Sequence, residues 1–174
     1  MAHTDGVRTA LHHTASVAAL TVLLSILAGC TPSAKNSTMT PEESRKALVQ
    51  LHEATIGALG TTGWTEMGGM PIQECVLGDG STGVNFGSYQ LGPASSHPDA
   101  DIATIEAVWK SKGLATTVKR STNPLDTTTR LMGSGGPVTI LEFDADTHRT
   151  SLTGDSVCVV GNAADLRNQV DGNG

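Results

Sequence analysis

The chain carries one uninterrupted apolar run near its start, residues 17–28, which reads VAALTVLLSILA and contains no charge. Residues 1–16 before it hold one Arg and one Asp. A membrane-spanning helix needs about 20 consecutive apolar residues, so this run is too short to span a bilayer and remain there. A short apolar core that ends in small residues is typical of a cleaved export signal. We therefore predict that residues 1–29 direct export.

The next apolar pattern has the spacing of a helix. Thr40 precedes Pro41 and stands three residues before Glu43, which is the pattern of a capping box with proline in the first turn. Apolar or small side chains then recur every three or four positions until Gly60, namely Leu48, Leu51, Thr55 and Leu59. A helix is predicted here. His52 lies inside it without a partner nearby in sequence, so we expect a surface or boundary position.

Glycine-broken extended segments and a second helix follow. The extended segments are residues 63–67, 73–77 and 84–91. The second helix is predicted to begin near Pro98 and to stop at Gly113. Its apolar face consists of Ile102, Ile105, Val108 and Trp109.

After the second helix the pattern indicates strands to the end of the chain. Short segments of strand-like composition alternate with turns rich in Gly, Asn, Asp and Pro, at residues 114–120, 127–132, 138–143, 150–152 and 157–160. Successive short strands joined by tight turns predict an antiparallel meander. The order of elements predicts an α+β fold with two layers, in which two helices cover one face of a mostly antiparallel sheet. The alternative is a small β-barrel with a helix.

The same pattern divides the chain into four parts. Residues 1–29 are the predicted signal, and residues 30–39 form a polar tether without periodicity. Residues 40–170 are predicted to fold as a single α+β domain, a length that suits one core. Residues 171–174 are a tail.

The end of the signal carries a specific motif. Leu27, Ala28, Gly29 and Cys30 resemble the bacterial lipobox, Leu-small-small-Cys. The resemblance implies cleavage between Gly29 and Cys30, a diacylglyceryl group on the Cys30 thiol, and attachment to the cell membrane on its extracytoplasmic face. Two acyl chains anchor a protein stably, whereas one is marginal. The alternative is an ordinary signal peptide with a chance cysteine at its end.

The remaining cysteines form an even pair once Cys30 is lipidated. Disulfides persist in the oxidising compartments that exported proteins reach, which favours a bridge between Cys75 and Cys158. A metal site built on these two cysteines would need further ligands close by, and no histidine lies near either in the sequence. A disulfide is therefore the favoured interpretation of Cys75 and Cys158, and a metal site is the alternative.

Charge excludes some partners. The chain has 11 basic and 17 acidic residues, and its net charge of −6 is unchanged when Arg8 and Asp5 leave with the signal. An acidic protein is not suited to nucleic acid or to electrostatic adhesion on anionic lipid headgroups. We therefore expect no nucleic-acid partner and a membrane contact through the lipid anchor.

Three residues are candidates for metal or hydrolytic chemistry because they lie close together in sequence: Asp144, Asp146 and His148. Their position between two predicted strands is also where Asp commonly serves a turn. Arg149 stands where a calcium-binding EF-hand loop beginning at Asp144 would need Gly. We expect no catalytic set and no cofactor beyond the covalent diacylglycerol.

Five features are spread over most of the mature chain as a sparse pattern: the lipobox, Gly63-Trp64 after the first helix, Cys75, the Val-Trp-Lys-Ser-Lys-Gly end of the second helix, and Leu-Thr-Gly-Asp-Ser-Val-Cys at residues 152–158. In this pattern the chain resembles small mycobacterial and actinobacterial lipoproteins of the LppA-like type. The resemblance implies a compact α+β domain with one disulfide and no assigned enzymatic chemistry.

Three functional hypotheses follow. The first is a membrane-anchored envelope lipoprotein that acts as a non-catalytic binding module for a protein, a lipid or a glycan. The second is a small hydrolase or metal-dependent enzyme that uses Asp144, Asp146 and His148, which would have to converge in a pocket. The third is a lipid or glycolipid carrier.

Overall fold

The computed structural model of the chain describes residues 38–123, 126–170 and 172. The predicted signal, the lipobox at residues 27–30 and most of the tether lie outside these residues. The described residues belong to one unit, Ser33–Gly174. None of its described helices is both long enough and apolar enough to cross a membrane.

Helix α1 (Pro41–Leu59) begins and ends where its short-range signals predict. The Glu43 backbone N–H donates to Thr40 Oγ1 over 3.3 Å, and the Thr40 N–H donates to Glu43 Oε2 over 2.8 Å, which completes the capping box. Gly60 closes the helix in the left-handed region with φ 62°, where glycine is the least strained residue. The buried stripe contains Leu48, Leu51, His52 and Thr55.

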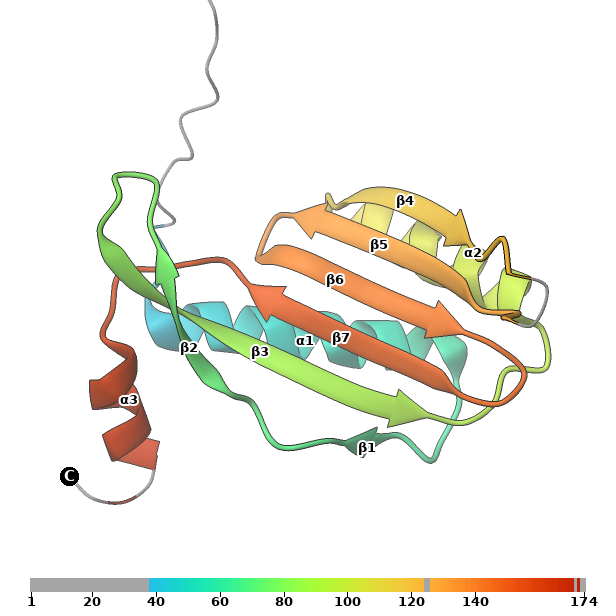
Figure 1. Cartoon of the computed structure of the whole chain (residues 1–174), viewed down its shortest axis with the longest axis horizontal. Helices are drawn as coiled ribbons and strands as arrows, with labels where there is room; N and C mark the ends of the chain where they lie inside the picture. Colours follow the sequence, from blue (N-terminus) through green and yellow to red (C-terminus); the bar gives the residue numbers. More distant parts are fainter. Residues whose placement is uncertain (1–37, 124–125, 171, 173–174) are drawn as a thin grey trace, which may run out of the picture. The chain divides into compact units, whose positions relative to one another are not determined.

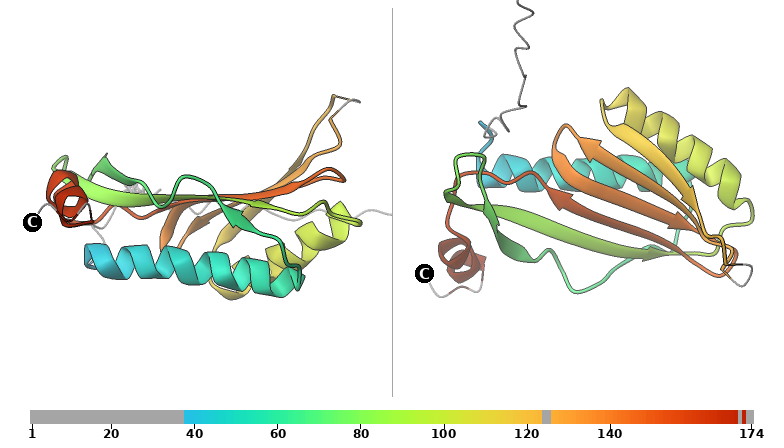
Figure 2. Two further views of the ribbon diagram at one scale, coloured as in Figure 1. Left: turned by 90° about the horizontal axis from the view of Figure 1, so that it is seen from below. Right: turned by 45° about the horizontal axis from the view of Figure 1, so that its top comes forward.

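A seven-stranded antiparallel sheet forms the second layer. Its strands are β1 (Thr65–Glu66), β2 (Ile72–Val76), β3 (Thr82–Gly92), β4 (Ala115–Arg120), β5 (Thr129–Gly135), β6 (Val138–Ala145) and β7 (Thr150–Ser156). The order is β1-β3-β7-β6-β5-β4 (Figure 1). Strand β2 also pairs with β3, at residues 82–86, whereas β1 pairs with residues 90 and 91 of β3. Helix α2 (Pro98–Ser111) and α1 cover the same face (Figure 2). The predicted α+β fold is confirmed.

The barrel alternative is wrong. In the described sheet β4 pairs only with β5, while β1 and β2 pair only with β3, so the two edges do not meet. The core therefore lies between one face of the sheet and the two helices. Its fully buried large side chains include Trp109 from α2 and four residues of the sheet, Leu131, Leu141, Phe143 and Leu152.

The last predicted strand is replaced by other structure. Strand β7 runs to Ser156, and within residues 157–160 the backbone makes one isolated bridge, between Val159 and Val84. Helix α3 (Ala163–Val170) then follows, which the sequence reading did not predict. Its start did carry a signal, because Asn162 Oδ1 accepts from the backbone N–H groups of Ala164 and Asp165 over 2.9 and 3.2 Å.

The expected bridge between Cys75 and Cys158 is present as a disulfide, with the Cα atoms 5.9 Å apart. It joins β2 to the segment that follows β7. Gly83 sits opposite Cys75 on β3, and a Cβ atom there would lie 2.6 Å from the Val159 carbonyl oxygen and 2.8 Å from Cys158 Sγ. Only glycine allows this close approach of the post-β7 segment to the β2–β3 hairpin.

Candidate functional site

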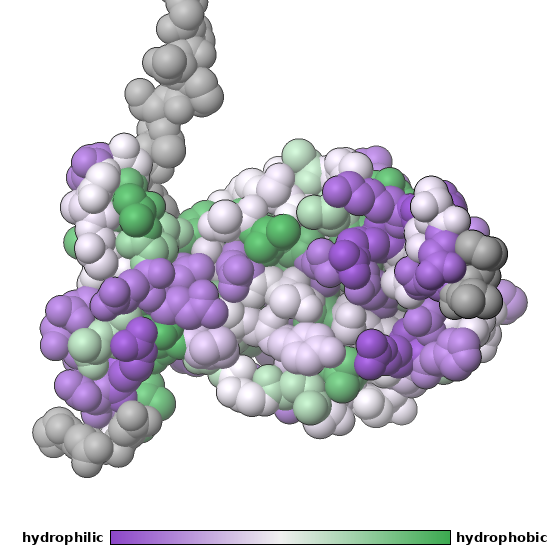
Figure 3. Space-filling model, viewed as in Figure 1, coloured by the Kyte–Doolittle hydropathy of each residue, from purple (hydrophilic) through white to green (hydrophobic). Residues whose placement is uncertain are grey.

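No described helix lies over the face of the sheet opposite α1 and α2, and we call this face the open face. Figure 3 looks onto this face, where hydrophilic and neutral residues predominate over the strands. An antiparallel sheet commonly keeps one face on the core and exposes the other to water. Two clusters of polar side chains lie on or beside the open face, and one contains predicted site residues whereas the other does not.

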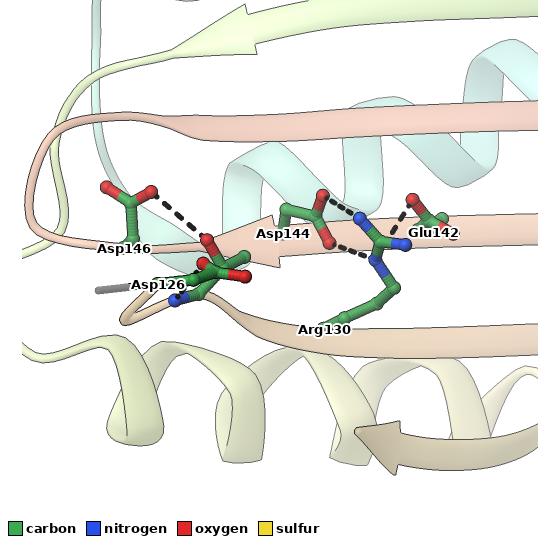
Figure 4. A network of polar contacts seen from close by, with 6 residues as sticks. Asp126, Arg130, Glu142, Asp144 and Asp146 are labelled. Carbon is green, nitrogen blue, oxygen red and sulfur yellow. Dashed lines mark hydrogen bonds and ion pairs between the residues drawn. The ribbon is translucent and has the colours of Figure 1, made fainter. Parts of the chain in front are cut away.

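The first cluster contains Asp144, which pairs with arginine. Arg130 on β5 donates from Nε and Nη2 to the two carboxylate oxygens of Asp144 over 2.7 and 2.8 Å, and Nε also lies 3.2 Å from Glu142 Oε1 (Figure 4). The hydrogen bond with Asp144 raises the pKa of the Arg130 guanidinium above its ordinary value. Bidentate pairing already occupies both oxygens of Asp144.

Asp146 and His148 lie in the turn between β6 and β7. Asp146 accepts from the backbone N–H groups of His148 and Arg149 and from the Thr128 hydroxyl. Burial alone raises the pKa of Asp146, but these hydrogen bonds outweigh it and the pKa falls below its ordinary value. The His148 side chain is 85% exposed, with Nδ1 3.4 Å from Asp146 Oδ1. Asp146 thus acts as the turn residue that the sequence offered as the alternative.

The structure does not bring the three candidate residues together. Asp144 points to Arg130, whereas Asp146 supports the turn and His148 extends into solvent. Within residues 38–123 and 126–170, no group of three or more His, Cys, Asp or Glu side chains is placed to hold a metal ion.

A buried histidine is the residue that sequence reasoning placed wrongly. His52 is 2% exposed, and its Nδ1 lies 3.2 Å from the Ser88 hydroxyl, while Nε2 is buried without a hydrogen-bond partner. Burial lowers the pKa of His52 to about 4. The signal was available, because His52 belongs to the same helical stripe as Leu48 and Thr55. In this interior Thr55 Oγ1 also accepts from Trp109 Nε1 over 2.9 Å.

The second cluster surrounds Gly87 on the open face, and we call it the Gly87 cleft. A Cβ atom at Gly87 would lie 3.1 Å from Pro71 Cγ, 3.1 Å from Gln73 Nε2 and 3.3 Å from Asp155 Oδ1, so these side chains gather over the glycine. The cleft has a volume of ≈ 240 Å³. Its lining residues are Met67, Gly68, Pro71, Gln73, Gly87, Ser88, Tyr89, Thr153 and Asp155.

Strand register explains why these residues meet. Gly87 pairs with Asp155, and Tyr89 pairs with Thr153, so their side chains share one face of β3 and β7. Residues 67–71 link β1 to β2 along the edge of β3 and form one wall. There the Met67 N–H donates to the Tyr89 carbonyl over 2.9 Å, and the Gly87 N–H donates to the Pro71 carbonyl over 3.0 Å.

The Gly87 cleft holds a carboxylate without a partner, and an unpartnered amide oxygen lies near it. In the described part of the chain the Asp155 carboxylate has no hydrogen bond or ion pair, and its partial burial raises the pKa. Nearby on β3, opposite Gln73, the buried Asn85 Oδ1 also lacks a partner. Buried or half-buried acceptors are normally satisfied, so the Asp155 carboxylate, which lines the cleft, is free to receive a donor from a ligand.

Comparison with known proteins bears on the fold. No family model matches the chain, and no curated protein matches it. A crystal structure of a DUF4853 family protein from Actinomyces odontolyticus superposes with a TM-score of 0.55 over 72% of this chain and 71% of that one, at 17% identity. The likeness is one of fold.

Proposed function

We propose that the protein is an exported lipoprotein, anchored through diacylglycerol on Cys30, whose domain is a non-catalytic binding module of the cell envelope. The lipobox tetrad at residues 27–30, directly after an apolar run too short to span a bilayer, supports the anchor. The Cys75–Cys158 disulfide supports export, because such bonds persist in oxidising compartments.

The observation that carries the binding role is the unpaired Asp155 carboxylate in the Gly87 cleft. Carboxylate and amide oxygens accept hydrogen bonds from hydroxyl groups, and the partly exposed Tyr89 offers an apolar ring beside them. The cleft is smaller than the roughly 300–1,000 Å³ typical of pockets for drug-sized ligands. This chemistry and size suit one ring of a hydroxyl-rich glycan, which is one of the envelope partners expected for such a protein.

Replacing Asp155 by Asn is expected to weaken glycan binding by about 10- to 100-fold, because a hydrogen bond to a charged group contributes roughly 1.5–3 kcal/mol. Affinities can be measured by calorimetry with soluble oligosaccharides of N-acetylhexosamine, mannose and arabinose. Asp144→Asn is the matched control, since it makes the same change on the same face at a carboxylate already paired with Arg130. Equal affinities for wild type and Asp155→Asn would exclude the cleft as the binding site.

The anchor has its own test. Cys30→Ser removes the thiol that would carry the lipid, so the protein is expected to leave the membrane fraction or to accumulate as uncleaved precursor. Fractionation and labelling with radioactive palmitate measure both effects. The double variant Cys75→Ser/Cys158→Ser keeps Cys30 and is expected to keep the label. Processed, membrane-bound Cys30→Ser protein would contradict the proposal.

A further inference from the structure

Several parts of the fold meet at one end, which we call the anchor end: the start of α1, the Cys75–Cys158 bridge and α3 (Figure 1). The Ser44 hydroxyl near the start of α1 donates to Ser156 Oγ over 2.9 Å and lies 3.2 Å from the Val157 carbonyl oxygen. A Cβ atom at Gly161, just before α3, would lie 3.0 Å from Pro41 Cγ. These contacts fix the anchor end as one packed unit.

Exposed valines gather on the anchor end. Val76, Val160 and Val170 are 74%, 65% and 76% exposed, and among the described residues they are the three most exposed of the large hydrophobic side chains. Val76 follows Cys75 directly, and Val160 stands two residues after Cys158, so the disulfide holds both segments together. A groove of ≈ 530 Å³ lies at the same end and is partly lined by Met70, Leu166 and Val170.

The tether attaches to the anchor end of the domain. Ten peptide units separate Cys30 from Thr40, and a fully extended chain spans at most about 3.3–3.6 Å per residue. The start of α1 therefore lies within about 35 Å of a lipidated Cys30. Helix α1 has 19 residues and extends for about 28 Å from this point, so the anchor end is the part of the domain that the tether joins directly.

The mixed charges of the anchor end do not favour an electrostatic contact with lipid headgroups. The anchor end combines acidic residues (Glu42, Glu74, Asp165) with basic ones (Arg45, Arg167), and Arg45 is already paired with Glu42 over 2.8 Å. The described residues of this end form no polybasic segment of the kind that binds anionic headgroups. Single exposed apolar side chains are common on soluble proteins, whereas several of them grouped at one end of a domain indicate a contact with protein or lipid.

We infer that the anchor end rests on the bilayer that holds Cys30, with the side chains of Val76 and Val160 in contact with lipid. This inference rests on the proposed anchor and adds an orientation to it. Attachment through Cys30 keeps the valines at a high local concentration near the bilayer, so a contact too weak to recruit the free domain still forms.

Tryptophan at single positions tests this orientation in the full lipidated protein on phosphatidylcholine vesicles. Val76→Trp and Val160→Trp place a fluorophore on the anchor end, and His148→Trp places one at the exposed β6–β7 turn near the other end. After subtraction of the Trp64 and Trp109 signal, acyl-brominated lipid is expected to quench the two anchor-end variants at least threefold more than His148→Trp. The difference is expected to persist in high salt.

Each other outcome overturns the inference in a distinguishable way. Equal, weak quenching of all three variants on protein that sediments with the vesicles would leave the anchor intact and exclude the lipid contact. Protein that does not sediment with the vesicles would contradict the anchor and the orientation together. A blue shift of Val160→Trp that appears without lipid and grows with protein concentration would assign the surface to a second copy of the chain.

Discussion

Removing the Cys75–Cys158 disulfide is expected to lower the free energy of unfolding by about 4–5 kcal/mol. The two cysteines are 83 residues apart, and in the chain-entropy model a loop of this length restricts the unfolded chain by about that amount. Total stabilities of small domains are only about 5–15 kcal/mol. Loss of the bond therefore removes a large part of the stability, and it also removes the covalent link between residues 157–160 and the β2–β3 hairpin, although the backbone bridge between Val84 and Val159 remains.

Urea unfolding of the protein with and without reductant measures this effect. The Cys75→Ser/Cys158→Ser variant is expected to unfold at the same low urea concentration as the reduced protein and to be insensitive to reductant. Identical unfolding midpoints for the oxidised and reduced wild type would refute the stabilising role of the bond.

Acid is expected to destabilise the fold by about 3 kcal/mol through His52 alone. Burial lowers the pKa of His52 from 6.5 to about 4, so the unfolded chain binds a proton more readily than the folded one does. The free energy of unfolding is therefore highest above pH 6.5 with respect to this group, falls as the pH drops from 6.5 to 4, and levels off below. The size follows from about 1.36 kcal/mol for each unit of pKa difference.

The His52 contribution is isolated by comparing the free energies of unfolding of variants at pH 7.5 and at pH 4. His52→Gln has no titrating imidazole, so its loss of stability between the two pH values is expected to be smaller than that of wild type by about 3 kcal/mol. His148→Gln removes an exposed histidine instead and is expected to follow wild type. A wild-type pH dependence in His52→Gln would show that the buried imidazole is not the acid-sensitive group.

Local signals predicted the fold well where they were strong. The start and end of α1 were given by Thr40, Pro41 and Gly60, whose effects act within one helical turn. The succession of short strands correctly indicated an antiparallel sheet. Residues 157–160 resembled a strand because they are apolar, but disulfide pairing and the single bridge to Val84 set their conformation, and neither can be read from local composition.

The candidate site was less predictable, because it depends on register rather than on proximity in sequence. Asp144 and Asp146 are two residues apart, yet one pairs with Arg130 across the sheet and the other supports a turn. The Gly87 cleft instead unites Gln73, Gly87 and Asp155 from three strands. The sequence analysis included Asp155 only within the motif at residues 152–158, because no local signal shows that Gly87 lies opposite Asp155 in the sheet.

The open edge of the sheet has a consequence for crowding on a membrane, where the proposed anchor would hold the protein. Within the described sheet strand β4 pairs only with β5, so its other side presents backbone groups to which a strand of another molecule could add. Proteins confined to a surface collide edge to edge more often than proteins in solution. Lys119 and Arg120 end this strand with two basic side chains, and Arg120 also pairs with Asp99 over 2.8 Å. In a parallel, in-register pairing of two β4 edges these basic residues would lie beside the same residues of the second copy. Charge, rather than closure of the sheet, thus opposes the parallel self-association of this edge.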